Sequence, residues 1–155
     1  MSWSRAEPQP LHAAHACAVR RHLLALDQDD RVARFGLGMR DEALGRWCAG
    51  IDWGRQRWWG VWLPDKAALA GVLQLAPTGR EGAWELALSV AAPLRRRGIG
   101  MQLLAQGCAS PARVLHCHHG HPAVRVMAAR LGCGWVAGAG LEGLDLIPPR
   151  AAVVP

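Results

Sequence analysis

Apolar residues in the first third of the chain recur at helical spacing. The spacing predicts a first helix over residues 11–26, with an apolar stripe that consists of Ala14, Cys17, Ala18, Leu24 and Ala25. A second helix begins at Asp41, a residue type that caps helices, and carries at i, i+3, i+4 and i+7 the expected core residues Leu44, Trp47, Cys48 and Ile51. Residues 27–31 are polar and predict a loop, and residues 3–6 predict a short edge strand before the first prolines.

The middle of the chain changes to short apolar runs that are typical of strands. Three runs cover residues 57–63, 68–76 and 84–90, with turn residues between them that mark two hairpins. The first run is apolar on both faces, so we expect helices on both sides of the sheet. The tryptophans of this run are therefore predicted to be core residues rather than the lining of a ligand site.

Helix and strand patterns alternate in the last third of the chain. The predicted elements are, in order, a helix over 99–108, a buried strand over 113–118, a helix with Pro122 in its first turn and Gly132 just past its end, and strands over 134–138 and 142–147. A strand, helix, strand order implies one parallel pair in an otherwise antiparallel sheet. The fold class is mixed α/β, and the length indicates one domain over residues 1–155.

Charge alone suggests an anionic partner, because the formal net charge is +6. The arginines are scattered, however, with one cluster at 95–97, and no nucleic-acid-binding motif accompanies them. We therefore expect no nucleic acid partner. The chain has one lysine and no tyrosine, and a GC-rich genome is the simplest explanation, so single absences can be drift.

The targeting features of the sequence and its cysteine pattern predict a cytoplasmic protein. No apolar run is long enough to span a bilayer, and the N-terminus lacks the apolar core of a signal peptide, so we expect no membrane partner. Five cysteines without regular spacing argue against a disulfide framework and suit a reducing compartment. We interpret them as small core residues, with Cys17, Cys48 and Cys133 in apolar surroundings.

The segment from Arg95 to Gly100 is the strongest candidate for a binding site. It joins the strand over 84–90 to a helix start, where backbone N–H groups lack partners and the helix dipole is positive. Glycines give access to those groups and arginines add charge, which suits a phosphate, although a basic surface turn explains the same residues equally well. Lys66 lies outside any Walker motif, and Leu103 stands where a dinucleotide fingerprint needs glycine.

The turn matches the pattern Arg/Gln-x-x-Gly-x-Gly/Ala at Arg95, Gly98 and Gly100, and residues 84–133 resemble the GCN5-related N-acetyltransferases (GNAT). The resemblance implies a mostly antiparallel sheet of six to seven strands, splayed between the fourth and fifth, with about four helices. It also implies acetyl-CoA as cosubstrate. The implied cofactor-binding residues are Leu88, Ser89 and Val90 on the strand, Arg95, Arg96, Arg97, Gly98, Ile99, Gly100 and Met101 on the turn and helix, and His121. At the place of His121 the family often has an Asn that contacts the cofactor. His121 either keeps that contact or caps its helix.

The implied reaction moves acetyl to a primary amine by direct attack in a ternary complex. Glu85 is the candidate general base, or else a strand acid that faces solvent or orients substrate. Many relatives use a tyrosine acid where this chain has Ala128, so the acid would be water, Ser89 or His121, or unnecessary. The alternative function is a CoA-binding or acyl-CoA-sensing module without catalysis.

Other polar clusters offer weaker candidates. In the run 116–121, His116 and His118 share a strand face and no second ligand pair exists, so we expect no metal. The histidines of the first helix, His12, His15 and His22, are interpreted as surface or groove residues. The acids in 27–31 could attract a cationic amine or form a solvated turn. The acceptor stays open between a small amine, an antibiotic, a polyamine and a protein amine, and a homodimer is one option.

Overall fold

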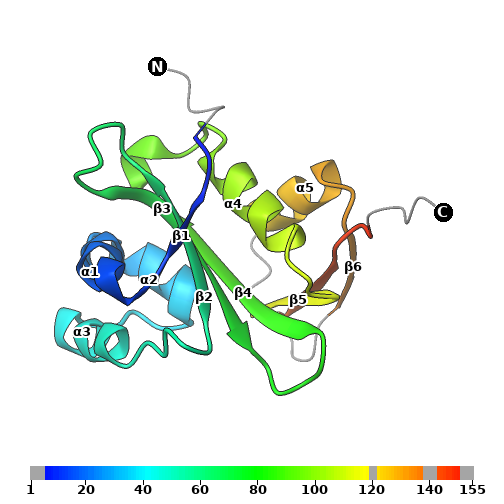
Figure 1. Ribbon diagram of the computed structural model, residues 1–155, viewed down its shortest axis with the longest axis horizontal. Coiled ribbons are helices and arrows are strands. Elements are labelled where there is room, and N and C mark those ends of the chain that lie inside the picture. Colours follow the sequence, from blue (N-terminus) through cyan, green and yellow to red (C-terminus); the bar gives the residue numbers. More distant parts are fainter. Residues whose placement is uncertain (1–5, 119–121, 138–142, 151–155) are drawn as a thin grey trace.

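The chain forms one seven-stranded sheet with helices on both faces (Figure 1). A computed structural model describes residues 6–118, 122–137 and 143–150. The strands are β1 Gln9–Leu11, β2 Arg57–Trp62, β3 Leu69–Pro77, β4 Ala83–Val90, β5 Val114–Cys117, β6 Gly134–Ala137 and β7 Leu144–Ile147. The helices are α1 Ala16–Leu24, α2 Gln28–Phe35, α3 Asp41–Ala49, α4 Ile99–Cys108 and α5 Pro122–Arg130. Within these described residues, no helix is long and apolar enough to cross a membrane.

The sheet opens beside its parallel pair of strands. The strand order is β1-β2-β3-β4-β5-β7-β6, and β4 and β5 run parallel while the other neighbours are antiparallel. β3 pairs with β4 from Trp84 to Val90, whereas β5 pairs with β4 only from Ala83 to Glu85. The backbone from Leu86 to Val90 therefore faces a gap instead of a strand. The predicted mixed fold and the predicted splay between the fourth and fifth strands are confirmed.

Two hydrophobic cores lie on opposite faces of this sheet. One core lies under α4 and α5 and includes Leu73, Leu103 and Leu115. The other lies under α1 and α3 and includes Leu23, Leu44 and Trp58. The prediction of helices on both faces is confirmed, and so is the placement of tryptophan in the core.

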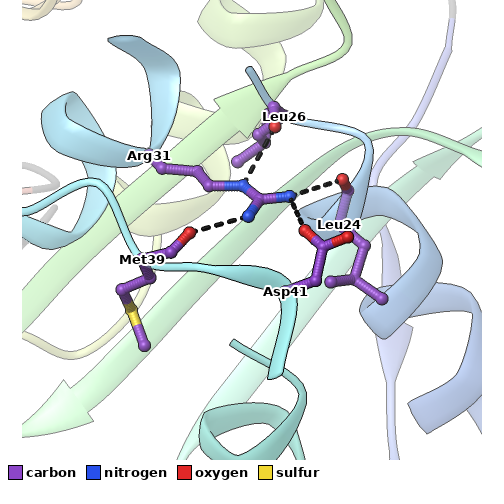
Figure 2. Close-up of polar contacts among 5 residues, drawn as sticks. All are labelled: Leu24, Leu26, Arg31, Met39 and Asp41. Atoms are coloured by element: carbon purple, nitrogen blue, oxygen red, sulfur yellow. Dashed lines mark hydrogen bonds and ion pairs between the residues drawn. The ribbon is translucent and has the colours of Figure 1, made fainter. Parts of the chain in front are cut away.

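Helix α2 corrects the sequence prediction, because residues 27–31 were expected to form a loop. Asp27 instead caps α2, accepting a hydrogen bond from the Asp30 N–H at 2.8 Å. The side chain of Arg31 is buried among α1, α2 and the start of α3 (Figure 2). Its Nε donates to the Leu26 carbonyl at 3.0 Å, and the other contacts are Nη1 to Met39 O at 2.7 Å, Nη2 to Leu24 O at 2.8 Å and Nη2 to Asp41 Oδ1 at 2.7 Å. Arg31 therefore holds α2 against α1 and α3, a role that a buried apolar residue has in most helices.

Of two other expectations about the N-terminal part, one falls mostly outside the described residues and the other is wrong in part. The first described strand is β1 at Gln9–Leu11, which includes a proline, and residues 3–5 of the predicted edge strand lie outside the described residues. Helix α1 begins at Ala16 and buries Val19, His22 and Leu23. Of the predicted stripe, Ala18 and Leu24 pack partly buried against the same core, whereas Ala14 and Ala25 are exposed. Cys17 is exposed, whereas Cys48 and Cys133 are buried as expected.

Candidate active site

A cavity of about 860 Å³ runs along the unpaired half of β4. Its walls come from β4, α2, the start of α4 and one side of α5. The structure brings together here the predicted site residues Glu85, Leu88, Ser89, Val90, Arg95, Arg96, Gly98, Ile99, Gly100 and Met101. Arg97 does not line the cavity, and His121 lies outside the described residues. The sequence analysis thus indicated the walls formed by β4 and by the start of α4, but it did not indicate the wall formed by α2.

The turn before α4 presents a helix N-terminus to the cavity. Gly98 is the N-cap residue with φ 87°, and no side chain caps this helix. Arg96, at φ 61°, also has the left-handed conformation, which is uncommon outside glycine and recurs in backbone anion sites. A Cβ at Gly98 would meet nothing within 4 Å, so the glycine is required by its φ and the space before the helix is open. Because helical bonds begin with the Gln102 N–H to Gly98 O at 3.1 Å, the N–H groups ahead of Gln102 are available to an anion.

The side chain of Arg95 links this turn to α2. Its Nε donates to the Val90 carbonyl at 3.1 Å, and its Nη2 lies 2.7 Å from Asp30 Oδ2. Asp30 also lines the cavity. The charge of Arg95 is therefore matched within the protein, which leaves the backbone N–H groups, Arg96 and Arg97 as the unpaired positive features of the turn among the described residues.

The two faces of β4 serve different neighbours. Leu86 points toward α4, because a Cβ on Gly107 would lie 3.0 Å from its side chain. Ser89 points to the other face, where its Oγ lies 2.9 Å from Nε2 of His22 on α1. Since Nδ1 of His22 lies 3.2 Å from the Leu69 carbonyl, which can only accept, Nδ1 carries the proton and Nε2 accepts from the Ser89 hydroxyl.

His22 is consequently a buried residue that ties α1 to the sheet, and the prediction of a surface or groove role is wrong. Burial lowers the pKa of His22 below its usual 6.5, so the ring is neutral at pH 7. The Ser89 hydroxyl points its proton at this ring. Such a geometry makes Ser89 a poor proton donor to a ligand in the cavity.

Glu85 stands beside a row of titratable side chains that crosses β5. Its Oε2 lies 3.1 Å from Nε2 of His118, and both side chains are partly exposed. The His118 ring packs edge-on against the ring of His116 at 4.8 Å, and His116 Nδ1 lies 2.5 Å from Asp145 Oδ1. His118 was missed as a site residue, although the strand alternation that puts 116 and 118 on one face was the signal that could have found it.

The histidine run was also considered as a metal site. In the ranges that the structure describes, no group of three or more His, Cys, Asp or Glu residues is placed to hold a metal ion. His119 and His121 lie outside those ranges. His116 and His118 instead contact the carboxylates of Asp145 and Glu85 and pack against each other.

Arg34 on α2 is a further cavity residue that sequence analysis missed. Its Nη2 donates to Gln74 Oε1 at 2.5 Å, and its Nε is buried without a hydrogen-bond partner among the described residues. Burial lowers its pKa to about 10, an effect that the Glu85 carboxylate opposes, so the guanidinium remains charged at pH 7. A polar helix that was expected to be a loop thus supplies a cation opposite the candidate base.

The remaining wall, α5, is mostly apolar, with Arg130 at its end. Val124 and Met127 line the cavity, whereas Ala128 is fully buried in the core and does not. The position compared with a catalytic tyrosine therefore does not face the cavity in this chain. Cys117 does line it, but burial, Asp145 and Glu85 raise the pKa of its thiol to about 12. The cysteine is thus protonated at pH 7 and a poor nucleophile.

A sheet opened beside a parallel β4–β5 pair, with a helix N-terminus at the opening, is the architecture of the GNAT acetyltransferases. An acetyltransferase from Thermus thermophilus matches with a TM-score of 0.65 at 19% identity, over 93% of this chain and 96% of that chain. A GNAT superfamily phosphinothricin acetyltransferase from Sinorhizobium meliloti, solved in complex with AcCoA, matches with a TM-score of 0.68 at 13% identity, over 97% and 96%. A ribosomal-protein-alanine N-acetyltransferase from Brucella melitensis matches with a TM-score of 0.64 at 17% identity, over 90% and 95%.

By structure, the chain therefore has the GNAT acetyltransferase fold. Comparison with protein-family models and with curated protein sequences gives no match. The likeness lies in the arrangement of the elements rather than in the sequence, so it carries no residue's role.

Proposed function

We propose that the protein is an acetyl-CoA-dependent N-acetyltransferase that moves acetyl directly to a primary amine. The observation that carries the proposal is the cavity along β4, which holds both a helix N-terminus suited to phosphate and the Glu85 carboxylate. The diphosphate of a CoA thioester needs an anion site, and the attacking amine needs a base that takes its proton. The AcCoA complex of a structural neighbour supports the same cosubstrate.

The residues on the donor side fit coenzyme A. The pyrophosphate would take hydrogen bonds from the first N–H groups of α4, with Arg96 adding charge. The gap beside β4 fits an extended pantetheine arm, which would bond to main-chain groups of Leu88, Ser89 and Val90 like an added strand. Arg97 would act through long-range charge, since it does not line the cavity.

The acceptor side fits a direct transfer. The amine nitrogen attacks the thioester carbon, the C–N bond forms and the C–S bond breaks. Glu85 takes the proton that the amine loses, and the departing thiolate takes up one proton, so the products are the amide and free CoA. His118, at 3.1 Å, would orient the Glu85 carboxylate. Cys117 would form no acyl intermediate, because its raised pKa keeps it protonated.

Release of free thiol tests the proposal. The purified protein is incubated with acetyl-CoA and a panel of primary amines, and calorimetry measures acetyl-CoA binding separately. We expect amine-dependent thiol release, and Glu85→Gln should lower kcat by at least about tenfold while the Kd for acetyl-CoA stays within about twofold. Glu81→Gln is the matched control, because Glu81 is an exposed acid just before β4.

Each other outcome has a definite meaning. Binding of acetyl-CoA without thiol release for any amine would replace the enzyme with a CoA-sensing module. Absence of binding would refute the assignment of the turn before α4. Equal rates for Glu85→Gln and Glu81→Gln would remove Glu85 as the base.

A further inference from the structure

We infer that the acceptor is an amino acid with a free carboxylate, and that Arg34 binds this carboxylate. The inference rests on the proposed function and adds the substrate class to it. Its basis is a guanidinium that lines the cavity beside Glu85 without an anion of its own among the described residues.

The arginines in and near the cavity differ in exposure and in how their charges are matched. Of those that line it, Arg96 and Arg130 are exposed to water, whereas Arg34 is partly buried and its Nε fully so. Arg31 lies 2.7 Å from an Asp41 oxygen, and Arg95 lies 2.7 Å from an Asp30 oxygen. Arg34 has no carboxylate oxygen within 4 Å in the part of the chain that the structure describes, and the neutral amide of Gln74 is its hydrogen-bond partner there. Because a cation taken out of water is stable only with a matching partner, the charge of Arg34 calls for an anion in the cavity.

Arg34 is held in place before any ligand arrives. Its Cζ lies 4.6 Å from the centre of the Phe35 ring and 5.5 Å from that of Trp47. Gln74 is itself fixed, since its Nε2 donates to Gln56 Oε1 at 2.8 Å and so directs its Oε1 to Arg34. A guanidinium held by one amide and two rings still has donors to spare and a planar fork that suits a carboxylate.

The position of Arg34 separates this anion from the phosphates of the donor. Asp30 and Arg34 are four residues apart, so they lie on one face of α2 about one helical turn apart. Asp30 pairs with Arg95 at the turn before α4, whereas Arg34 interacts with the charge of Glu85. The Glu85 end of the cavity therefore offers a carboxylate, partnered by His118, and the guanidinium of Arg34, which match the amine and the carboxylate of a zwitterion.

The test compares amino acids with their own primary amides, which keep the size and lose the charge. Rates are divided by the fraction of neutral amine at the assay pH, because amides have more acidic amines. We expect wild-type kcat/KM to favour the acid by at least about tenfold, the size of one charged hydrogen-bonded pair. Arg34→Gln should reduce that preference to about twofold, through the KM for the acid. α-, β- and γ-amino acids then report the spacing between the two charges.

Controls separate binding from folding. Arg46→Gln on α3 removes an exposed arginine and should change nothing. Arg34→Lys keeps the charge and should restore part of the preference, while thermal unfolding checks that each variant is folded. Calorimetric titration with the same acid and amide pairs gives a readout that needs no turnover.

Two results would overturn the inference while leaving acetyl transfer intact. One is a wild type that uses or binds amides as well as acids. The other is an Arg34→Gln variant that loses activity on acids and amides equally, which would give Arg34 a structural role. Thiol release with no amine at all would instead refute the proposed function, and the titrations would still decide whether Arg34 binds carboxylates.

Discussion

Replacement of Arg31 by methionine tests how α2 is held against the rest of the protein. Methionine keeps a long apolar stem and removes every donor of the guanidinium. Three backbone carbonyls and one carboxylate lose a charged donor, as Figure 2 shows. The carbonyls of Leu24, Leu26 and Met39 join the end of α1, the start of α2 and the approach to α3. The variant should therefore loosen all three helices together.

The size of the effect follows from the three carbonyl bonds. A hydrogen bond to a charged group contributes about 1.5–3 kcal/mol. We take the lower end for each of the three bonds, because water can reach the carbonyls once the guanidinium is removed, and obtain a loss of about 4.5 kcal/mol. Asp41 adds little, since its side chain is 74% exposed and water replaces its partner. At about 3 °C per kcal/mol, Tm should fall by roughly 13 °C.

Thermal unfolding followed by circular dichroism measures this change. Asp41→Asn isolates the exposed ion pair and should lower Tm by no more than about 3 °C. Arg55→Met is the control for losing an exposed arginine and should leave Tm unchanged. If Arg31→Met unfolds within about 3 °C of wild type, or if Asp41→Asn costs as much as Arg31→Met, the carbonyl bonds do not hold α2 and the reasoning fails.

Two further predictions concern His22 and Gly98. The pKa of His22 is lowered in the folded protein, so below about pH 6.5 the unfolded chain binds more protons and the free energy of unfolding falls as the pH decreases. Between pH 7 and about pH 5, the Tm of His22→Gln should therefore fall by less than the Tm of the wild type. An equal fall in both proteins would contradict a lowered pKa of His22. Gly98→Ala places a side chain at φ 87° and should cost about 1 kcal/mol of stability and weaken acetyl-CoA binding in calorimetry. Unchanged affinity would show that the cofactor does not use this helix end.

The sequence pattern predicts one half of the site well. Helix α4 has the predicted bounds, 99–108, and the basic turn before it follows β4 as expected. These features are local, because a glycine with positive φ and a helix start depend on neighbouring residues in the chain. The parallel pairing of β4 and β5 also follows from the order of the elements.

The other half of the site depends on contacts between distant segments. Arg31 is the buried residue of α2, so hydrophobic periodicity finds no apolar stripe there and predicts a loop. His22 is buried because two partners, at Leu69 and Ser89, satisfy its ring nitrogens. His118 meets Glu85 only because β5 lies beside β4. A polar side chain becomes a core or site residue through such partners, and sequence spacing does not reveal them.

Helix α2 connects the two ends of the cavity. Its Asp30 pairs with the turn before α4, and its Arg34 faces the Glu85 end of the cavity. Arg31 lies about 100 degrees around the helix from Asp30, and it fixes α2 to α1 and α3. One short polar helix therefore sets the distance between the proposed phosphate site and the proposed carboxylate site. A change at either site that moves α2 must be felt at the other, so donor and acceptor binding are expected to be coupled energetically.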